Sequence, residues 1–201
     1  LDAVEKGTLK RRDIAAEYWQ QLKGNSSSDT AARARKLEGA KPAPSSAEMA
    51  ALTTKLLPIA NQKGDAKRGK EIFDMVCINC HTLEGKGGKI GPELTGIGIR
   101  PRADILVDII DPNRSVEANF RQWSVTTKSG ETVTGRLEAE TQTSVEILDL
   151  TGVKHVVQRK DIAKLDASML SIMPTGFEQL PPADLAAILE YLAQSTHEPK
   201  K

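Results

Sequence analysis

Apolar residues recur every three or four positions near the start of the chain, which predicts two short amphipathic helices within residues 1–40. The apolar face of the first helix is made of Ile14, Ala15, Tyr18, Trp19 and Leu22. This helix is expected to end at Gly24, before a polar run that can cap the next helix. The apolar face of the second helix consists of Ala31, Ala34 and Leu37.

A proline-rich linker over residues 41–44 precedes a third predicted helix. Ser45 and Glu48 have the spacing of a capping box, in which each side chain accepts a hydrogen bond from the backbone N–H of the other residue. The apolar faces of these helices are too narrow to support a separate fold. We therefore expect residues 1–60 to form a helical extension, either a collar on the following domain or the end of a helical repeat array.

Two further apolar stripes predict the helices of the main core. One helix delivers Cys77 at its end. The other lies near the C-terminus and has an apolar face made of Leu185, Ile188, Leu189 and Leu192. Because Gly69 has no side chain and permits a close approach, we expect the two helices to cross with Gly69 and Phe73 against Tyr191.

Residues 120–165 change to the alternating pattern of β-strands, beginning with Trp123 and Val125 and turning at Gly130 and Gly152. The pattern predicts a meander of about four short antiparallel strands. Its apolar face is thin, so we expect the sheet to depend on packing against the helices. The predicted fold class is mainly α: a helical domain over residues 61–201, interrupted by this small sheet and preceded by the helical extension.

The composition of the 201-residue chain excludes several classes of protein. The 28 basic residues nearly balance the 27 acidic ones, whereas a nucleic-acid-binding protein needs a basic surplus. No stretch approaches the roughly 18 to 20 apolar residues that span a bilayer. The chain begins at Leu1, so we expect a processed product or a piece of a longer protein. Aromatic residues make up only 3%, which leaves room in the core for another large apolar body.

Both cysteines lie in one run, Cys77-Ile-Asn-Cys80-His81. A thioredoxin-like redox pair would follow a buried strand, which the flanking sequence does not offer. A zinc site would need further ligands, but the other histidines, His155 and His197, are isolated. The adjacent His81 favours covalent haem, because two thiols three residues apart reach the two vinyl groups while the next residue ligates iron.

These residues resemble the single-haem, all-helical cytochromes c over residues 64–119 and 166–195. The shared motifs are Gly69-Lys-Glu-Ile-Phe73, the C-x-x-C-H run, Gly91-Pro92-Glu-Leu94-Thr-Gly96 and a Met-Pro pair before the last helix. The chain is more narrowly similar to the modular PVC-type haem-binding family, in which helical repeats precede the haem domain and a small sheet interrupts it. Its order of motifs includes Asp111-Pro112-Asn113-Arg114, a Ser-Gly hairpin and Met173-Pro174-Thr-Gly176.

The resemblance implies a role for each residue of the site. Cys77 and Cys80 would attach one haem c covalently, and His81 would be the proximal iron ligand. The carbonyl of Pro92 would accept the Nδ1 proton of His81, which fixes the orientation of the imidazole. Leu94 would pack on the haem face.

The sixth iron ligand has to come from another part of the chain. Met173 is favoured because it stands in a non-helical loop at the Met-Pro position of the family. Met169 is the closest competitor, followed by His155, Met75 and Met49. A thioether is a soft ligand that favours ferrous iron, so the expected haem is six-coordinate and has a relatively high potential.

The expected function is electron transfer by a c-type cytochrome domain with His/Met ligation, and the domain itself is not expected to be an enzyme. The alternatives are a haem enzyme or gas sensor with an open distal site, or an interaction module with a structural haem. The expected partners are redox proteins or a fused dehydrogenase domain. The resemblance also implies a periplasmic or otherwise extracytoplasmic location.

Overall fold

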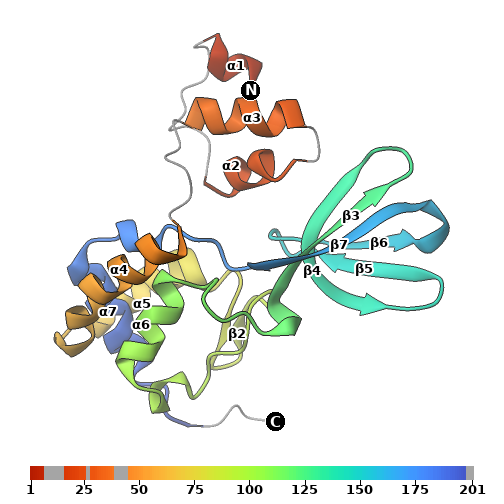
Figure 1. The fold of residues 1–201 in the computed structure, drawn as a ribbon. Helices are drawn as coiled ribbons and strands as arrows, with labels where there is room; N and C mark the ends of the chain where they lie inside the picture. The colour runs from red at the N-terminus through yellow and green to blue at the C-terminus, as the bar shows by residue number, and fades with distance from the viewer. Residues whose placement is uncertain (7–15, 26–27, 39–44, 198–201) are drawn as a thin grey trace.

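The structure is a computed structural model that describes residues 1–6, 16–25, 28–38 and 45–197 (Figure 1). In the first part of these described residues lie the helices α1 (Asp2–Glu5), α2 (Ala16–Lys23) and α3 (Ser28–Glu38). The two helices predicted within residues 1–40 correspond to α2 and α3. Ile14 and Ala15, which were assigned to the first apolar face, lie outside the described residues.

The helices α1, α2 and α3 lie together in Figure 1 and share a few buried side chains. Trp19 of α2 is buried, as are Ala31 and Ala34 of α3. Arg33 of α3 forms ion pairs with Asp2 and Glu5 of α1. This buried surface is small, which agrees with the narrow apolar faces expected from the sequence.

The helix α4 (Ser46–Leu56) begins with the predicted capping box, which is confirmed. The N–H of Ser45 donates to Glu48 Oε2 at 2.7 Å, and the N–H of Glu48 donates to Ser45 Oγ at 3.3 Å. The 3₁₀ turn η2 (Leu57–Asn61) continues α4. Met49 of α4 and Ile59 of η2 are buried in the same apolar cluster as the helices that follow.

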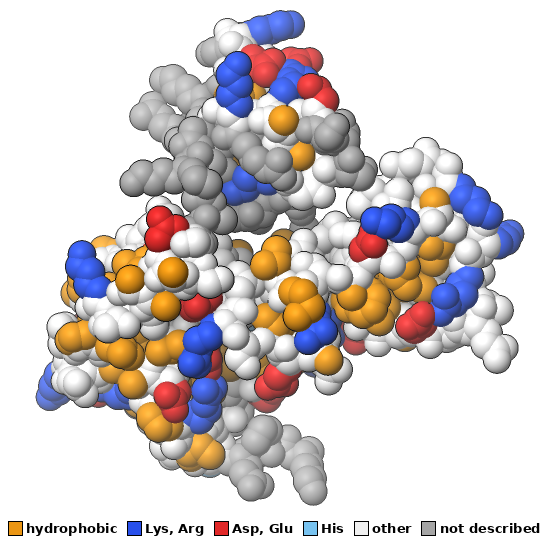
Figure 2. Space-filling view, viewed as in Figure 1, with side chains coloured by type: hydrophobic (Ala, Val, Ile, Leu, Met, Phe, Trp, Pro, Cys, Tyr) orange, Lys and Arg blue, Asp and Glu red, His pale blue; other side chains and the backbone are white. Residues whose placement is uncertain are grey.

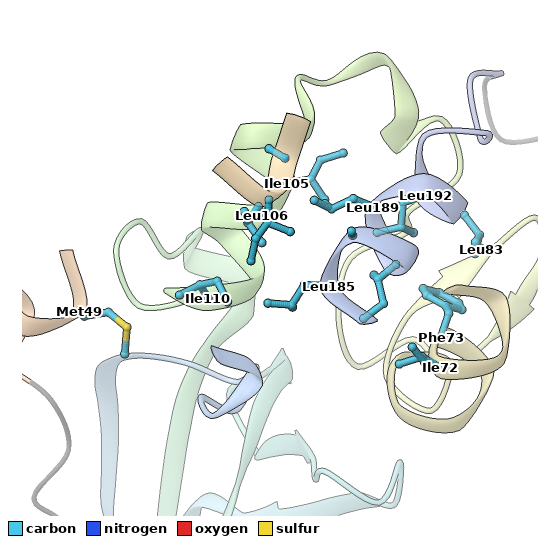
Figure 3. Close-up of a cluster of buried hydrophobic side chains, with 14 residues drawn as sticks. Met49, Ile72, Phe73, Leu83, Ile105, Leu106, Ile110, Leu185, Leu189 and Leu192 are labelled. Carbon is cyan, nitrogen blue, oxygen red and sulfur yellow. The ribbon is translucent and has the colours of Figure 1, made fainter. Parts of the chain in front are cut away.

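That apolar cluster is the helical core (Figure 3). It is built mainly from α5 (Ala66–Ile72), the π-helical turn η3 (Phe73–Cys77), α6 (Arg102–Ile110) and α7 (Pro182–Leu192). Asp65 caps α5 by accepting hydrogen bonds from the N–H groups of Lys67 and Arg68. Between α5 and α6 lie β1 (Thr82–Leu83), β2 (Lys86–Gly87) and η4 (Ile97–Ile99), and η7 (Phe177–Gln179) precedes α7.

The predicted crossing of α5 and α7 is confirmed. A Cβ atom added to Gly69 would lie 1.9 Å from the carbonyl oxygen of Ala187 and 2.9 Å from the Cβ of Tyr191, so glycine is required at this contact. The rings of Phe73 and Tyr191 pack at 5.6 Å between centroids with an interplanar angle of 59°. This tilted arrangement is one that aromatic pairs favour.

A five-stranded antiparallel sheet follows, which corrects the predicted mainly α class to a mixed α and β fold. Its strands are β3 (Arg121–Thr127), β4 (Thr132–Glu140), β5 (Ser144–Leu148), β6 (Lys154–Gln158) and β7 (Ile162–Ser171), in the order β6-β5-β4-β3-β7. The 3₁₀ turns η5 (Ala118–Phe120) and η6 (Arg159–Asp161) precede β3 and β7. The strand β7 has no regular alternation of half-buried and exposed positions, and its pairing with β3 is irregular in two places. The predicted sheet ended at residue 165, so more than half of β7 was assigned to the helical domain, although residues 164–169 alternate between polar and apolar.

The sheet has an apolar core of its own. Val125, Val145 and Ile147 are fully buried, and the partly buried apolar residues packed against them also come from the sheet strands. In Figure 1 the sheet curls away from the helices. The buried cluster of the sheet is thus made of sheet residues, and whether the sheet is stable without the helices stays a prediction.

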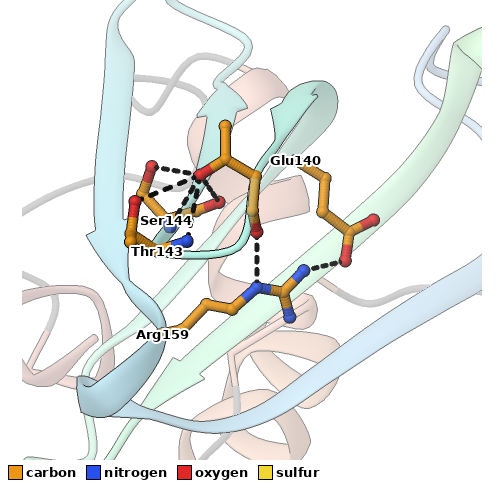
Figure 4. A network of polar contacts seen from close by, with 5 residues as sticks. Glu140, Thr143, Ser144 and Arg159 are labelled. Atoms are coloured by element: carbon orange, nitrogen blue, oxygen red, sulfur yellow. Dashed lines mark hydrogen bonds and ion pairs between the residues drawn. The ribbon is translucent and has the colours of Figure 1, made fainter.

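The turn between β4 and β5 is held by a polar network (Figure 4). The Oγ1 of Thr141 accepts hydrogen bonds from the N–H groups of Thr143 and Ser144, at 3.2 and 3.0 Å. Arg159 donates from Nε to the carbonyl of Thr141 at 2.7 Å and forms an ion pair with Glu140. These contacts fasten the β4–β5 turn to the segment between β6 and β7.

Within the described ranges, no helix combines the length and the apolar character needed to cross a bilayer. On the face shown in Figure 2, hydrophobic side chains are spread over both the helical part and the sheet. Large exposed apolar residues include Met75, Ile99, Val156 and Met169, which come from both parts of the chain. Apolar surface alone therefore does not mark one docking face.

Candidate haem-attachment site

The C-x-x-C-H run starts in the π-helical turn η3 at the end of α5. The N–H of Ile78 donates to the carbonyl of Phe73, five residues back, at 2.9 Å. The N–H groups of Cys80 and His81 both donate to the carbonyl of Cys77, at 3.1 and 3.0 Å. Such wide turns within helices are frequent at functional sites. Cys77 ends the π-helical turn and residues 78–80 continue it as a hydrogen-bonded turn, so both thiols and the imidazole follow the end of α5 closely.

The two cysteines are free and half-buried. Burial, and to a smaller extent the neighbouring Cys80, raises the pKa of the Cys77 thiol to about 12. Burial also raises the pKa of Cys80. A thioredoxin-like redox pair instead has a cysteine whose pKa is lowered. The electrostatics of the site therefore disfavour an activated thiolate.

The imidazole of His81 is fixed by a hydrogen bond to the loop that follows. Its Nδ1 lies 2.9 Å from the carbonyl oxygen of Pro92. A carbonyl oxygen can only accept, so Nδ1 carries the proton and the lone pair remains on Nε2. Burial lowers the pKa of His81, which favours the neutral form that binds metals. This is the hydrogen bond expected from the resemblance.

Gly91 packs directly against the imidazole ring. A Cβ atom at this position would lie 2.6 Å from Cε1 and 2.8 Å from Nδ1 of His81. The N–H of Gly91 also donates to the carbonyl of Cys80 at 2.7 Å, which prevents the loop from moving away. The Gly-Pro pair therefore positions His81 from two sides.

The glycines after His81 serve the backbone of the C-x-x-C-H run itself. A Cβ atom on Gly87 would lie 2.1 Å from the carbonyl oxygen of His81, and one on Gly88 would lie 2.0 Å from that of Asn79. The N–H of Gly88 donates to the carbonyl of Ile78 at 2.8 Å. The loop of Gly87 and Gly88 therefore packs directly against the backbone of the C-x-x-C-H run.

A polar clamp around Glu84 was not found from the sequence. Glu84 has a positive φ of 53°, and its carboxylate accepts a hydrogen bond from the Oγ of Ser195 at 2.6 Å. Its other oxygen lies 2.7 Å from Nε2 of His197. The N–H of Gly98 donates to the carbonyl of Ser195 at 2.7 Å. Glu84 lies 111 positions from Ser195 and 113 from His197. No local pattern could therefore reveal that the clamp ties the C-terminal segment to the loop after His81.

The apolar surroundings of the run come from the helical core. Cys77, Ile78, Leu94 and Ile97 are partly buried and pack against the core cluster. Leu94, which the resemblance placed on the haem face, is held by a hydrogen bond from its N–H to the carbonyl of Thr82 at 2.8 Å. The site thus lies at the edge of the helical core.

The structure places the candidates for the sixth ligand in very different surroundings. Met49 is buried in the helical core. Met75 and Met169 point into solvent, with 69% and 73% of their surface exposed, which excludes the possibility that Met169 fills the core. His155 lies on β6, where Nε2 is 2.7 Å from Asp149 Oδ2. Met173 is half-buried in the irregular segment that follows β7.

Comparison with known proteins points to the same class of site. Residues 66–145 match the family model for cytochrome c. A cytochrome c of Cochliobolus lunatus is 54% identical over 37 residues, which cover 18% of this chain and 34% of that protein. A cytochrome c of Arabidopsis thaliana is 56% identical over 36 residues, covering 17% and 32%, respectively. A cytochrome c of Kluyveromyces lactis is 40% identical over 42 residues, covering 20% and 38%.

The chain spans about a third of the length of the curated relatives it matches. These matches support a c-type cytochrome domain, and the cofactor of this family is covalently bound haem c. The residues of this structure fit that group, because two unpaired thiols stand beside an imidazole whose hydrogen bond to Pro92 leaves Nε2 as the metal-binding atom. The matches support a haem-based electron-transfer role for the domain.

Proposed function

We propose that residues 61–201 form an electron-transfer cytochrome c domain with His/Met ligation. Cys77 and Cys80 attach haem c, while His81 and Met173 hold its iron. When bound, haem supplies a one-electron couple between ferric and ferrous iron. The hydrogen bond between His81 Nδ1 and the carbonyl of Pro92 carries this proposal, because it fixes the tautomer and ring orientation that a proximal ligand requires.

The chain's own residues keep this ligand in place. The carbonyl of Pro92 holds the Nδ1 proton, Gly91 packs against the ring, and the lowered pKa of His81 keeps the imidazole neutral near pH 7. Leu94 adds apolar surface beside the run and excludes water. An electron carrier needs such a preorganised site, since little then has to move when the charge on the iron changes.

Met173 is the sixth ligand in this proposal. It is half-buried in a segment without regular structure, whereas Met169 is exposed on β7 and Met49 belongs to the helical core. The nearby Ser171 Oγ accepts a hydrogen bond from the N–H of Met173 at 3.1 Å. These features favour a methionine whose backbone is held in place and whose thioether is available to the iron.

A pair of methionine variants tests the ligand. Met173→Ala should abolish the sulfur-to-iron charge-transfer band near the red end of the ferric spectrum, because the thioether is its source. Met169→Ala is the matched control and should leave the band unchanged, since Met169 is 73% exposed. A band that survives in Met173→Ala and disappears in Met169→Ala would assign the ligand to Met169.

The closed coordination of the iron distinguishes an electron carrier from an enzyme or a gas sensor. The reduced protein should not bind carbon monoxide rapidly and stoichiometrically without denaturant, because His81 and Met173 would both hold the iron. Met173→Ala, which opens one position, is the positive control. Rapid binding by the unmodified protein would favour a sensor or an enzyme with an open distal site.

We also propose that the domain belongs to a larger modular redox protein of the PVC-type kind. The sheet β3–β7 between the two halves of the helical core and the helices α1–α3 ahead of it support this proposal. Its partners would be redox proteins or a fused dehydrogenase domain. In c-type cytochromes, haem is attached after the apoprotein has been exported. An extracytoplasmic, periplasmic location is therefore part of this proposal. Expression in a bacterium with and without an export signal should give haem-loaded protein only in the exported form.

A further inference from the structure

The motif Asp111-Pro112-Asn113-Arg114 forms the turn that ends α6. The N–H of Asp111 donates to the carbonyl of Val107 at 2.8 Å, and the N–H of Arg114 donates to the carbonyl of Asp111 at 3.1 Å. Pro112 is buried and cannot continue the helix. The turn is therefore compact, and it is anchored to a helix whose residues Leu106 and Ile110 are fully buried in the helical core.

The side chain of Asn113 reaches the end of the sheet. Its Oδ1 accepts a hydrogen bond from the N–H of Ser171 at 2.8 Å, although the two residues are 58 positions apart. Ser171 is the last residue of β7 and stands opposite Arg121 of β3. Met173 follows two positions later. The hydrogen bond thus lies at the start of the segment that carries the proposed iron ligand.

Three consecutive backbone N–H groups of this segment have fixed acceptors. The N–H of Ser171 donates to Asn113, and that of Ile172 donates to the carbonyl of Phe120 at 2.8 Å. The N–H of Met173 donates to the Oγ of Ser171 at 3.1 Å. Ile172 is also buried, with 6% of its surface exposed. The backbone leading to Met173 is therefore held at every residue.

The three acceptors have different origins. The carbonyl of Phe120 belongs to the segment that leads into β3, and Ser171 belongs to β7, so both move with the sheet. Asn113 instead follows α6, which packs in the same apolar cluster as α5 and Cys77. Among these three contacts, that of Asn113 alone ties the start of the Met173 segment to the helical part that carries His81.

We propose that Asn113 is a positioning residue for Met173, holding the loop at the distance from the helical core at which the thioether can ligate iron. The inference rests on the proposed role of Met173. A thioether is a weak ligand, and ordering a loop opposes its conformational entropy, so the ligand-bound state depends on a loop that is already fixed. A typical hydrogen bond that is lost when the thioether leaves the iron shifts this equilibrium about fivefold.

Imidazole titration of the ferric holoprotein tests this proposal, because imidazole competes with the thioether and removes the charge-transfer band. Asn113→Ala should bind imidazole about fivefold more tightly than the unmodified protein. Asn113→Asp keeps an acceptor oxygen in place, so its affinity for imidazole should stay close to the weaker affinity of the unmodified protein. Asn119→Ala is the matched control, since Asn119 is exposed in the neighbouring turn η5 and should not change the affinity.

Thermal unfolding separates positioning from general stability. A merely structural role would lower the melting temperature of Asn113→Ala and leave its imidazole affinity equal to that of Asn119→Ala, and this result would overturn the proposal. If Asn113→Ala does not fold, Asn113→Ser provides the same test, because its hydroxyl is too short to replace Oδ1. A charge-transfer band that survives in Met173→Ala would overturn the proposed ligand itself. Loss of the band in Met173→Ala with unchanged titration of the Asn113 variants would overturn only the positioning role.

Discussion

Gly91→Ala is expected to displace the imidazole of His81, and the structure gives the size of the effect. The added Cβ would lie 2.6 Å from Cε1 of His81, far inside an ordinary carbon contact. The N–H of Gly91 is bonded to the carbonyl of Cys80, so the loop cannot retreat, and the ring must shift away from the carbonyl of Pro92. Overpacking costs about 1–3 kcal/mol and the lost hydrogen bond about 1 kcal/mol, so the free energy of unfolding should fall by about 2–4 kcal/mol.

Guanidinium unfolding of the holoprotein, followed by far-ultraviolet circular dichroism and by haem absorbance, measures this loss. Gly85→Ala is the matched control in the same loop: Gly85 has a φ of 75° with no heavy atom within 4 Å of an added Cβ. Gly85→Ala should lower the free energy of unfolding by only about 1–2 kcal/mol, because alanine is strained in the left-handed backbone conformation. The reasoning is refuted if Gly91→Ala destabilises the protein no more than Gly85→Ala does.

Three other substitutions test the fold around the site. Gly69→Ala should lower the free energy of unfolding by up to about 2 kcal/mol, because a clash of about 1–3 kcal/mol with a carbonyl of α7 outweighs a helix-propensity gain of about 1 kcal/mol. A more stable variant in urea titration would contradict the tight crossing. The pKa of Glu190 is lowered by a hydrogen bond from the N–H of Gly64 and by a nearby arginine. The ionised carboxylate therefore stabilises the fold above the ordinary carboxyl pKa, and this stabilisation is lost as the pH falls through the lowered pKa. In urea titrations across the acid range, Glu190→Gln should lose less stability on acidification than the unmodified protein, and parallel curves would count against this linkage. Glu84→Ala should release the C-terminal clamp and speed amide exchange at Gly98, whereas unchanged exchange would show that the clamp does not hold that segment.

Local features of the sequence predicted those parts of the molecule that depend on short-range physics. The capping box of Ser45 and Glu48 depends on residues three positions apart, and the crossing at Gly69 follows from helical spacing and the absence of a side chain. The hydrogen bond between His81 and Pro92 was expected through the resemblance, because the two residues occupy motifs of fixed order. In each case the local sequence around each residue carries the signature, even where the residues in contact are far apart, as Gly69 and Tyr191 are.

The features that were missed depend on the extent of the sheet or on contacts distant in sequence. The mainly α class was wrong because the sheet has five strands and β7 continues to Ser171, past the predicted end of the sheet at residue 165. The contact from Asn113 to Ser171 and the clamp of Glu84 with Ser195 join residues 58 and 111 positions apart. Tertiary folding alone creates such pairs.

The central claim is that Cys77 and Cys80 attach haem c covalently beside His81. The pyridine haemochrome spectrum of the purified holoprotein tests it most directly, because the position of its α band reports how many thioether bonds the porphyrin carries. The account predicts the band of a haem with two thioether bonds, which stays with the polypeptide after acid-acetone extraction. A spectrum of unmodified haem that is extracted from the protein, or no haem at all, would contradict it.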